Sequence, residues 1–126
     1  MKPAPPGYRF LALGDSYTIG ESVARGERWP NQLVAALGEE GLAVQAPEII
    51  ATTGWTTSDL KAGIARAKPV GPYDLVSLLI GVNDQYQGRS AEQYREGFRA
   101  LLAQAVGFAG GDSSRVIVLD IPDWGV

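Results

Sequence analysis

The fold is decided by one stretch near the amino terminus, which reads Leu11-Ala12-Leu13-Gly14-Asp15-Ser16-Tyr17-Thr18-Ile19-Gly20. An apolar run over residues 8–13 stops abruptly at a glycine, and small and polar residues follow before any helical pattern begins. This pattern predicts a buried strand that ends in a turn, with the hydroxyl of Ser16 just beyond its carboxyl end. In open parallel α/β sheets, ligands bind at this edge because the loops and helix N-termini there face a common crevice.

Downstream of this stretch, apolar strand patterns alternate with helical patterns. Strands are expected at residues 42–50, 73–80 and 115–121, and helices at about 30–39, 58–68 and 91–106. The segment at 73–80 is the clearest central strand, because its almost continuous apolar run suits a strand covered on both faces. The alternation, with short loops, predicts an α/β fold in which a single domain, residues 1–126, places a parallel sheet between helices.

Local signals refine the ends of these elements. Pro47 interrupts the second strand, which predicts an irregular strand or one near the edge of the sheet. Thr57 or Ser58 is the expected N-cap of the helix that follows. Ser90 and Gln93 have the spacing of a capping box at the start of the longest helix.

Composition narrows the classes of function. Of the 126 residues, 45% are apolar and 20% are charged, as in an ordinary soluble domain. The formal charge of −3 offers no basic excess, so neither nucleic acid nor an anionic membrane is an expected partner. Cysteine is absent, which excludes thiolate metal sites, and we expect no cofactor and no metal. Histidine, the usual base for a serine nucleophile, is absent as well.

No segment of the sequence has the form of a membrane span or of a signal peptide. No apolar run approaches the ~20 residues that a spanning helix requires. Residues 1–7 form a proline-rich lead-in without the apolar core of a signal peptide. We therefore expect a cytoplasmic protein, or one whose export signal has been removed.

Three predicted strand ends carry groups suited to one reaction. Ser16 follows the first strand, Gly54 lies in the polar loop after the second, and Asn83 follows the third. In a parallel sheet these turns project from one edge, so the residues can meet there. Acyl transfer needs a nucleophile and donors aimed at the oxyanion of the tetrahedral intermediate. The Ser16 hydroxyl, the N–H groups of Ser16 and Gly54, and the Asn83 amide make up such a set.

Each of these residues also has a purely structural interpretation. A serine in such a turn is more often a helix cap, a glycine is more often a turn residue, and an asparagine often bonds its own backbone. A flavodoxin-like binding module is a further alternative, because residues 16–20 occupy the place of a phosphate-binding loop. The spacing matches neither a Gly-x-Gly-x-x-Gly fingerprint nor a P-loop, since no lysine follows Gly20. The occurrence of all three groups at successive strand ends favours acyl-transfer chemistry.

The strand-end segments resemble the first three sequence blocks of the GDSL, or SGNH, hydrolase family. They are Gly14-Asp15-Ser16, Gly54 within residues 51–56, and Gly81-Val82-Asn83-Asp84. They run in the family's order, and the resemblance extends over about residues 8–124, with Tyr17 where the family name has leucine. It implies a flavodoxin-like three-layer α/β/α sandwich and a metal-free hydrolase of small-molecule acyl or acetyl esters. It also implies that Ser16 is the nucleophile and that its N–H, Gly54 and Asn83 form the oxyanion hole.

The family's fourth block, Asp-x-x-His, has no match in this sequence. Asp120 and Asp123 lie near the expected sheet edge but have no histidine to orient. Without that base, the hydroxyl of Ser16 stays neutral and is a poor nucleophile. We therefore expect the chain to be the N-terminal part of a longer hydrolase and to be inactive alone. The alternative is a non-catalytic protein that kept the fold and the binding cleft.

The resemblance also implies a fifth strand beside the one at residues 116–119 and a further covering helix. Where these are missing, an apolar strand edge is exposed. We expect this edge to pair with a second copy of the chain, in a homodimer, or with the missing C-terminal segment.

Overall fold

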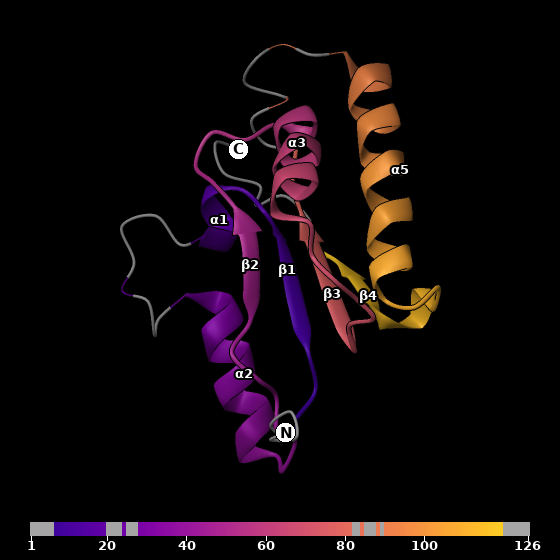
Figure 1. Ribbon diagram of the computed structural model, residues 1–126. Helices are drawn as coiled ribbons and strands as arrows, with labels where there is room; N and C mark the ends of the chain where they lie inside the picture. The colour runs from indigo at the N-terminus through magenta and orange to yellow at the C-terminus, as the bar shows by residue number, and fades with distance from the viewer. Residues whose placement is uncertain are drawn as a thin grey trace.

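The computed structural model describes residues 7–19, 24, 28–81, 84, 88 and 90–119, and for Ser16 and Tyr17 it describes the main chain alone. Strands and helices alternate along these residues, as the sequence pattern predicts (Figure 1). The elements are β1 (Phe10–Gly14), α1 (Ser16–Ile19), α2 (Trp29–Glu39), β2 (Glu48–Ala51), α3 (Thr57–Ala67), β3 (Leu75–Leu79), α5 (Ala91–Phe108), the 3₁₀ turn η2 (Ser113–Arg115) and β4 (Val116–Val118).

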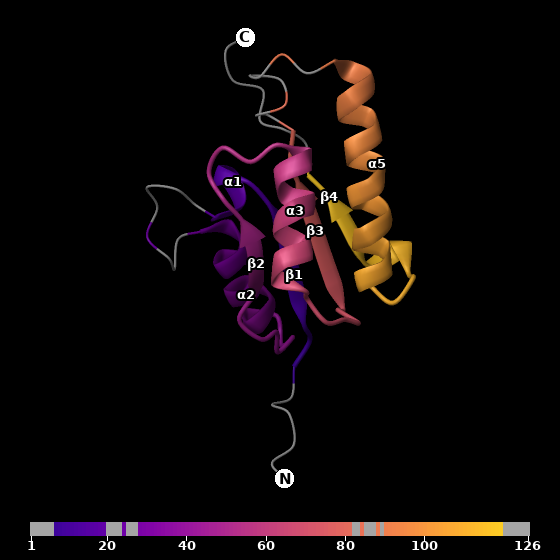
Figure 2. The ribbon, with the colours of Figure 1, turned by 45° about the horizontal axis from the view of Figure 1, so that its top comes forward.

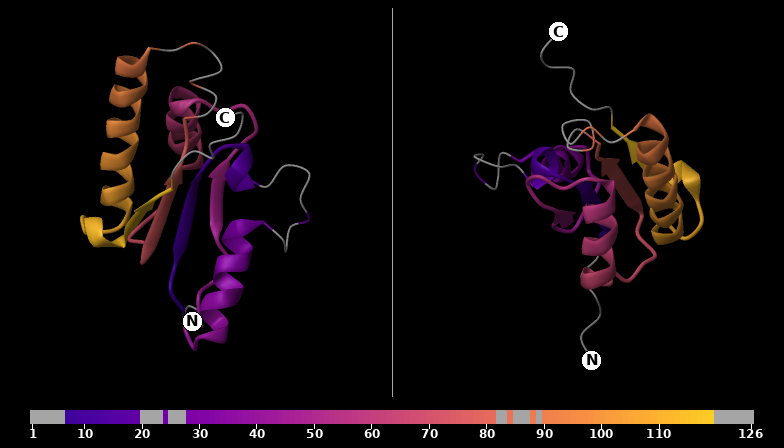
Figure 3. Two further views of the ribbon diagram at one scale, coloured as in Figure 1. Left: turned by 180° about the vertical axis from the view of Figure 1, so that it is seen from behind. Right: turned by 90° about the horizontal axis from the view of Figure 1, so that it is seen from above.

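The four strands form a parallel sheet in the order β2-β1-β3-β4. The sheet lies between two helical layers, with α3 and α5 on one face and α1 and α2 on the other (Figures 2 and 3). This arrangement confirms the predicted three-layer α/β/α sandwich. Because all strands are parallel, their carboxyl ends meet at one edge, which is the upper edge in Figure 1. We call this the carboxyl edge and the opposite one the amino edge.

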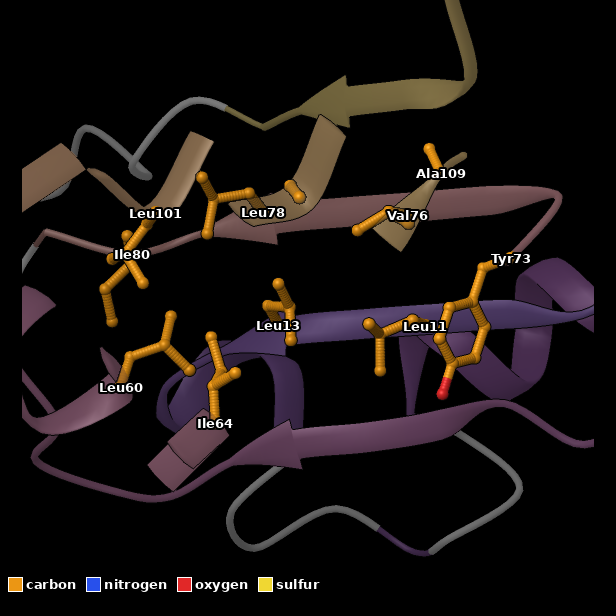
Figure 4. Close-up of a cluster of buried hydrophobic side chains, with 11 residues drawn as sticks. Leu11, Leu13, Leu60, Ile64, Tyr73, Val76, Leu78, Ile80, Leu101 and Ala109 are labelled. Carbon is orange, nitrogen blue, oxygen red and sulfur yellow. The ribbon is translucent and has the colours of Figure 1, made fainter. Parts of the chain in front are cut away.

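The core lies between the sheet and the layer formed by α3 and α5 (Figure 4). Alternate residues of the two central strands point into it, as the period of a strand requires. These strand residues are Leu11, Leu13, Val76 and Leu78, and they pack against Leu60, Ile64, Leu101 and Ala105 of the two helices. Phe10 and Ala12 are buried on the other face, where the Phe10 ring lies 6.0 Å from that of Trp29. The central strands are therefore buried on both sides, which explains their continuous apolar sequence.

The second strand is shorter than the sequence pattern predicts. Residues 42–47 do not form a strand; Val44 makes an isolated parallel bridge to Tyr8, and β2 begins at Glu48, directly after Pro47. A proline has no N–H to donate to the ladder, so pairing resumes only beyond it. The prediction of an edge position is confirmed, because β2 pairs only with β1 among the described strands.

The helix α3 starts one residue earlier than predicted. Its N-cap is Thr56, rather than Thr57 or Ser58, because Asp59 stands three residues later and completes a capping box. The Thr56 side chain accepts from the Asp59 N–H, and the Asp59 carboxylate accepts from the Thr56 N–H at 3.0 Å. The hydroxyl of Thr57 is thereby left for a different contact. The capping box of Ser90 and Gln93 at the start of α5 is confirmed.

The strand β4 forms the outer edge of the described sheet. It covers Val116–Val118, less than the predicted 115–121, and residues 120 and 121 lie outside the described part. Two of its side chains are exposed, Ile117 at 42% and Val118 at 46%. The described helices include none that is long and apolar enough to cross a membrane.

Candidate active site

The carboxyl edge brings the three predicted strand-end loops next to one another. Gly14, the last residue of β1, pairs with Ala51 of β2 on one side and with Leu79 of β3 on the other. Ser16, Gly54 and Asn83 follow these three paired residues at short distances along the chain. The three loops thus leave the sheet from adjacent strands in register, which is the arrangement that the sequence analysis requires.

Ser16 is the first residue of α1, directly after the end of the central strand β1. The turn is held by its own main chain, since the N–H groups of Thr18 and Ile19 donate to the carbonyl of Asp15 at 3.0 and 2.9 Å. Both Asp15 and Thr18 are buried, at 1% and 0% exposure. The prediction that places the Ser16 main chain at the carboxyl end of a buried strand is confirmed, although the turn forms a short helix, which the sequence pattern does not predict.

Gly14 is required by the packing of this turn. A β-carbon at this position would lie 2.2 Å from the hydroxyl oxygen of Thr18 and 2.7 Å from the carbonyl oxygen of Leu79. The second contact is with main chain of the neighbouring strand, which cannot swing aside as a side chain can. The absence of a side chain at Gly14 therefore allows the serine turn to fold back closely over the end of β3.

Gly54 lies in the loop between β2 and α3. Its φ angle is +86°, a left-handed conformation that glycine adopts without strain, and no heavy atom lies within 4 Å of where a β-carbon would stand. The loop is closed by the N–H of Trp55, which donates to the carbonyl of Thr52 at 3.3 Å. The Gly54 main chain is thus shaped by a tight turn, and the space on its Cβ side is open.

The indole of Trp55 anchors this loop to α3. A β-carbon at Gly63 would lie 2.2 Å from the Trp55 ring, so the glycine provides the space into which the indole fits. Beside it, a shallow groove of about 330 Å³ is lined by residues of β2, of the loop after it and of α3, which include Ala51, Thr52 and Arg66.

Asn83 lies outside the described residues, between Gly81 and Asp84, which the structure does describe. Gly81 is buried with a φ angle of +132°, and Asp84 is 1% exposed. Tyr94 of α5 reaches this segment, because its hydroxyl donates to the carbonyl of Ile80 at 3.3 Å. Burial raises the pKa of Tyr94, and the nearby Asp84 carboxylate raises it further.

The structure also reveals a contact that the sequence analysis missed. The carboxylate of Asp84 accepts two hydrogen bonds from Thr57, one from its N–H and one from its hydroxyl, each at 2.8 Å. Both residues are almost completely buried, at 1% exposure. One signal in the sequence could have indicated this contact: Asp84 directly follows Asn83 after an apolar strand, and a buried carboxylate needs hydrogen-bond partners. Within the described part of the chain, no group of three or more acidic side chains could hold a metal ion.

Comparison with known proteins places this arrangement in context. Residues 12–125 match the model of the GDSL-like Lipase/Acylhydrolase family. No curated protein matches the chain.

Several solved structures share the fold. AlinE4, an SGNH-hydrolase family esterase, superposes with a TM-score of 0.74 at 21% identity, over 95% of this chain and 63% of that one. The lipase Lip_vut3 from a goat rumen metagenome gives 0.69 at 18% identity, over 90% and 62%. The esterase EstA from Pseudoalteromonas sp., in a structure inhibited by monoethylphosphonate, gives 0.64 at 18% identity, over 91% and 61%. This chain thus spans less than two thirds of the length of these structures.

Proposed function

Because the chain belongs to the GDSL-like Lipase/Acylhydrolase family, we propose that it carries the nucleophile and the oxyanion-binding groups of a serine esterase. The observation that carries the proposal is the pairing of Gly14 with both Ala51 and Leu79, which makes the three predicted site loops neighbours at one edge. The structural relatives are esterases and lipases, in agreement with this chemistry.

In the proposed reaction, the Ser16 oxygen attacks the carbonyl carbon of a carboxylic ester. The new carbon–oxygen bond gives a tetrahedral intermediate, whose negative oxygen accepts hydrogen bonds from the N–H of Ser16, the N–H of Gly54 and the Asn83 amide. Collapse expels the alcohol and leaves an acyl group on Ser16, and water then releases the acid. The expected substrates are small-molecule acyl or acetyl esters, and no part of this scheme calls on a metal or cofactor.

A base must take the proton of Ser16, and the 126 residues contain no histidine. We therefore assign the base to a histidine outside these residues, in the Asp-x-x-His block that the family resemblance implies. The residues alone retain whatever the oxyanion hole and binding provide, which in serine hydrolases without a triad member is ~10³–10⁴-fold over water. They should therefore turn over esters slowly or not at all.

The open edge of β4 supports the predicted pairing with further polypeptide, either a second copy or more of the same chain. Ile117 is 42% exposed and Val118 is 46% exposed, on a strand whose outer side pairs with no other described strand. Analytical ultracentrifugation of the 126 residues tests this pairing. A stable, soluble monomer across the concentration range would contradict it.

The test of the function is the hydrolysis of p-nitrophenyl acetate and butyrate by the complete gene product. Ser16→Ala should reduce turnover by at least about 10³-fold, as expected for loss of a nucleophile. Ser114→Ala is the matched control, because Ser114 is an exposed serine beside Asp112 at the amino edge, and it should leave turnover unchanged. Turnover that survives Ser16→Ala would refute the nucleophile assignment. A complete gene product without any Ser16-dependent turnover would favour the non-catalytic alternative.

A further inference from the structure

Two loops of the carboxyl edge are joined by one buried pair of residues. Thr57 begins α3, three residues after Gly54, and Asp84 directly follows Asn83. The Asp84 carboxylate accepts from both the N–H and the hydroxyl of Thr57, at 2.8 Å each. The capping-box contacts between Thr56 and Asp59 at this helix end are local, because they span three residues. The Thr57–Asp84 pair spans 27 residues and is therefore a link between loops.

Burial makes this link stronger than its surface equivalent would be. Each of the two residues is 1% exposed, so a lost partner cannot be replaced readily by water. A carboxylate that accepts from a backbone N–H and a hydroxyl forms charge-assisted bonds, which are shorter and stronger than neutral ones. The pair therefore holds the first turn of α3 in one position relative to the end of β3.

The helix α5 packs closely against the side chain of Thr57. A β-carbon at Gly97 would lie 2.5 Å from the Thr57 hydroxyl oxygen and 3.0 Å from its β-carbon. The sequence does not explain a glycine in the middle of this helix. In the structure, the glycine leaves room for the Thr57 side chain. The same helix contacts the end of β3 through the Tyr94 hydroxyl, which donates to the carbonyl of Ile80.

We propose that Asp84, through Thr57, is a positioning residue that sets the distance between the two donor loops of the oxyanion hole. The inference rests on the proposed function, in which Gly54 and Asn83 supply donors. An oxyanion hole works only when its donors already point at one spot before the charge develops. Gly54 and Asn83 lie on separate loops, and the Thr57–Asp84 bonds tie those loops together within three residues of each donor.

The first part of the test asks whether the link exists, and it needs no activity. Hydrogen–deuterium exchange is followed in the complete gene product, and each variant is observed in the loop that it does not alter. Thr57→Val, which loses one buried bond, should speed exchange in the peptide over residues 81–84 by about ten-fold. Asp84→Ala, which loses two, should speed exchange in the peptide over residues 52–56 by at least about ten-fold. Asp59→Ala is the matched control, since it removes a carboxylate from the same helix end whose hydrogen bonds, among the described residues, go to Thr56. Equal effects of Asp59→Ala on residues 81–84 would overturn the link.

The second part asks whether the link matters for catalysis, in the complete gene product. Thr57→Val and Asp84→Ala should lower kcat by about 10- to 100-fold with KM changed less than about two-fold. The reason is that misplaced donors weaken the binding of the oxyanion, which forms only as the transition state is approached. Asp84→Asn and Thr57→Ser should restore most of kcat, since their side chains can still bond across the same gap. Melting temperatures confirm that each variant is folded under the assay conditions.

The outcomes separate this inference from the proposed function. If Ser16→Ala leaves turnover unchanged, the proposed function fails and with it the positioning role, whereas the exchange experiment still decides the link. If turnover depends on Ser16 but Thr57→Val and Asp84→Ala lower kcat no more than Asp59→Ala does, the esterase assignment stands and the positioning role is overturned.

Discussion

At the amino edge of the sheet, charged side chains lie at the surface, whereas at the carboxyl edge polar side chains are buried. Arg9 and Glu48 form an ion pair of 3.2 Å at the amino edge, with both side chains about one third to one half exposed. Six polar residues are buried in the described part of the chain, and all but Ser77 lie at or next to the carboxyl edge. They are Asp15, Thr18, Thr56, Thr57, Ser77 and Asp84.

The carboxyl edge is therefore the more constrained part of the fold. Exposed ion pairs contribute little to stability and tolerate change. A buried hydroxyl or carboxylate raises the free energy of the folded state unless it makes a hydrogen bond. The positions of these side chains at the carboxyl edge are therefore restricted by their partners. In this protein that edge also carries Gly14, where an added β-carbon would meet both the Thr18 side chain and the main chain of Leu79. Substitutions of the buried polar residues and of Gly14 should therefore cost more than substitutions of the exposed ion pair at the amino edge.

The largest effect is expected for Gly14→Ala. The added methyl group would press on the carbonyl of Leu79, so the variant should lose about 3 kcal/mol of the free energy of unfolding, or fail to fold. Gly38→Ala in α2 is the control, because no atom lies within 4 Å of the added carbon. Urea denaturation measures both. A Gly14→Ala variant as stable as Gly38→Ala would remove the basis for the comparison.

A smaller effect, of opposite sign at two glycines of one helix, is expected for α5. Gly97 lies against Thr57, whereas a β-carbon at Gly107, near the amino edge, meets no atom within 4 Å. Gly107→Ala should stabilise the protein by about 0.5–1 kcal/mol through helix propensity. Gly97→Ala should destabilise it by about 1–2 kcal/mol because of the clash. If thermal denaturation shows both variants equally stabilised, the contact with Thr57 is not tight.

An effect that is absent at neutral pH is expected at the amino edge, in the alkaline range. Burial raises the pKa of Tyr73 to about 12, and the Glu48 carboxylate contributes, although the Arg9 guanidinium, 4.2 Å from the ring centroid, opposes the rise. The folded state thus favours the neutral phenol. Its contribution to stability is complete below pH 10 and is lost as the pH rises toward 12, by about 1 kcal/mol at pH 11.

Tyr73→Phe provides the measurement, because it removes this ionisation and little else. The difference in the free energy of unfolding between the wild type and Tyr73→Phe should be constant up to about pH 10 and then shift in favour of the variant. A difference that stays constant to pH 11.5 would show that the phenol ionises equally easily in both states.

Much of the fold was predictable because periodicity reports burial directly. The run before Gly14 and the run at 73–80 could be assigned to central strands, since only a strand covered on both faces is continuously apolar. The helix at 91–106 was equally clear from its capping box and apolar stripe, which includes the fully buried Leu101 and Ala105. The strand predicted at 42–50 was wrong in its first half, because Pro47 limits pairing more than the apolar residues before it promote it.

Long-range contacts account for what the sequence could not predict at the candidate site. The pattern predicted that Ser16, Gly54 and Asn83 follow strand ends, because this depends on local turns alone. It did not predict the link between Thr57 and Asp84, which depends on how α3 is capped and on where α5 crosses it. The sequence could not explain Gly97 for the same reason, because the residue that it contacts, Thr57, lies on another helix. The roles of Ser16, Gly54 and Asn83 remain predictions.

Covalent labelling tests the central claim, that Ser16 is the reacting group of the carboxyl edge, most directly. The complete gene product is treated with a fluorophosphonate, digested and mapped by mass spectrometry while ester turnover is followed in parallel. We expect one adduct, on Ser16, formed in proportion to the loss of turnover and absent from Ser16→Ala. Full loss of turnover with Ser16 unmodified, or an adduct that forms equally on Ser16→Ala, would contradict the account.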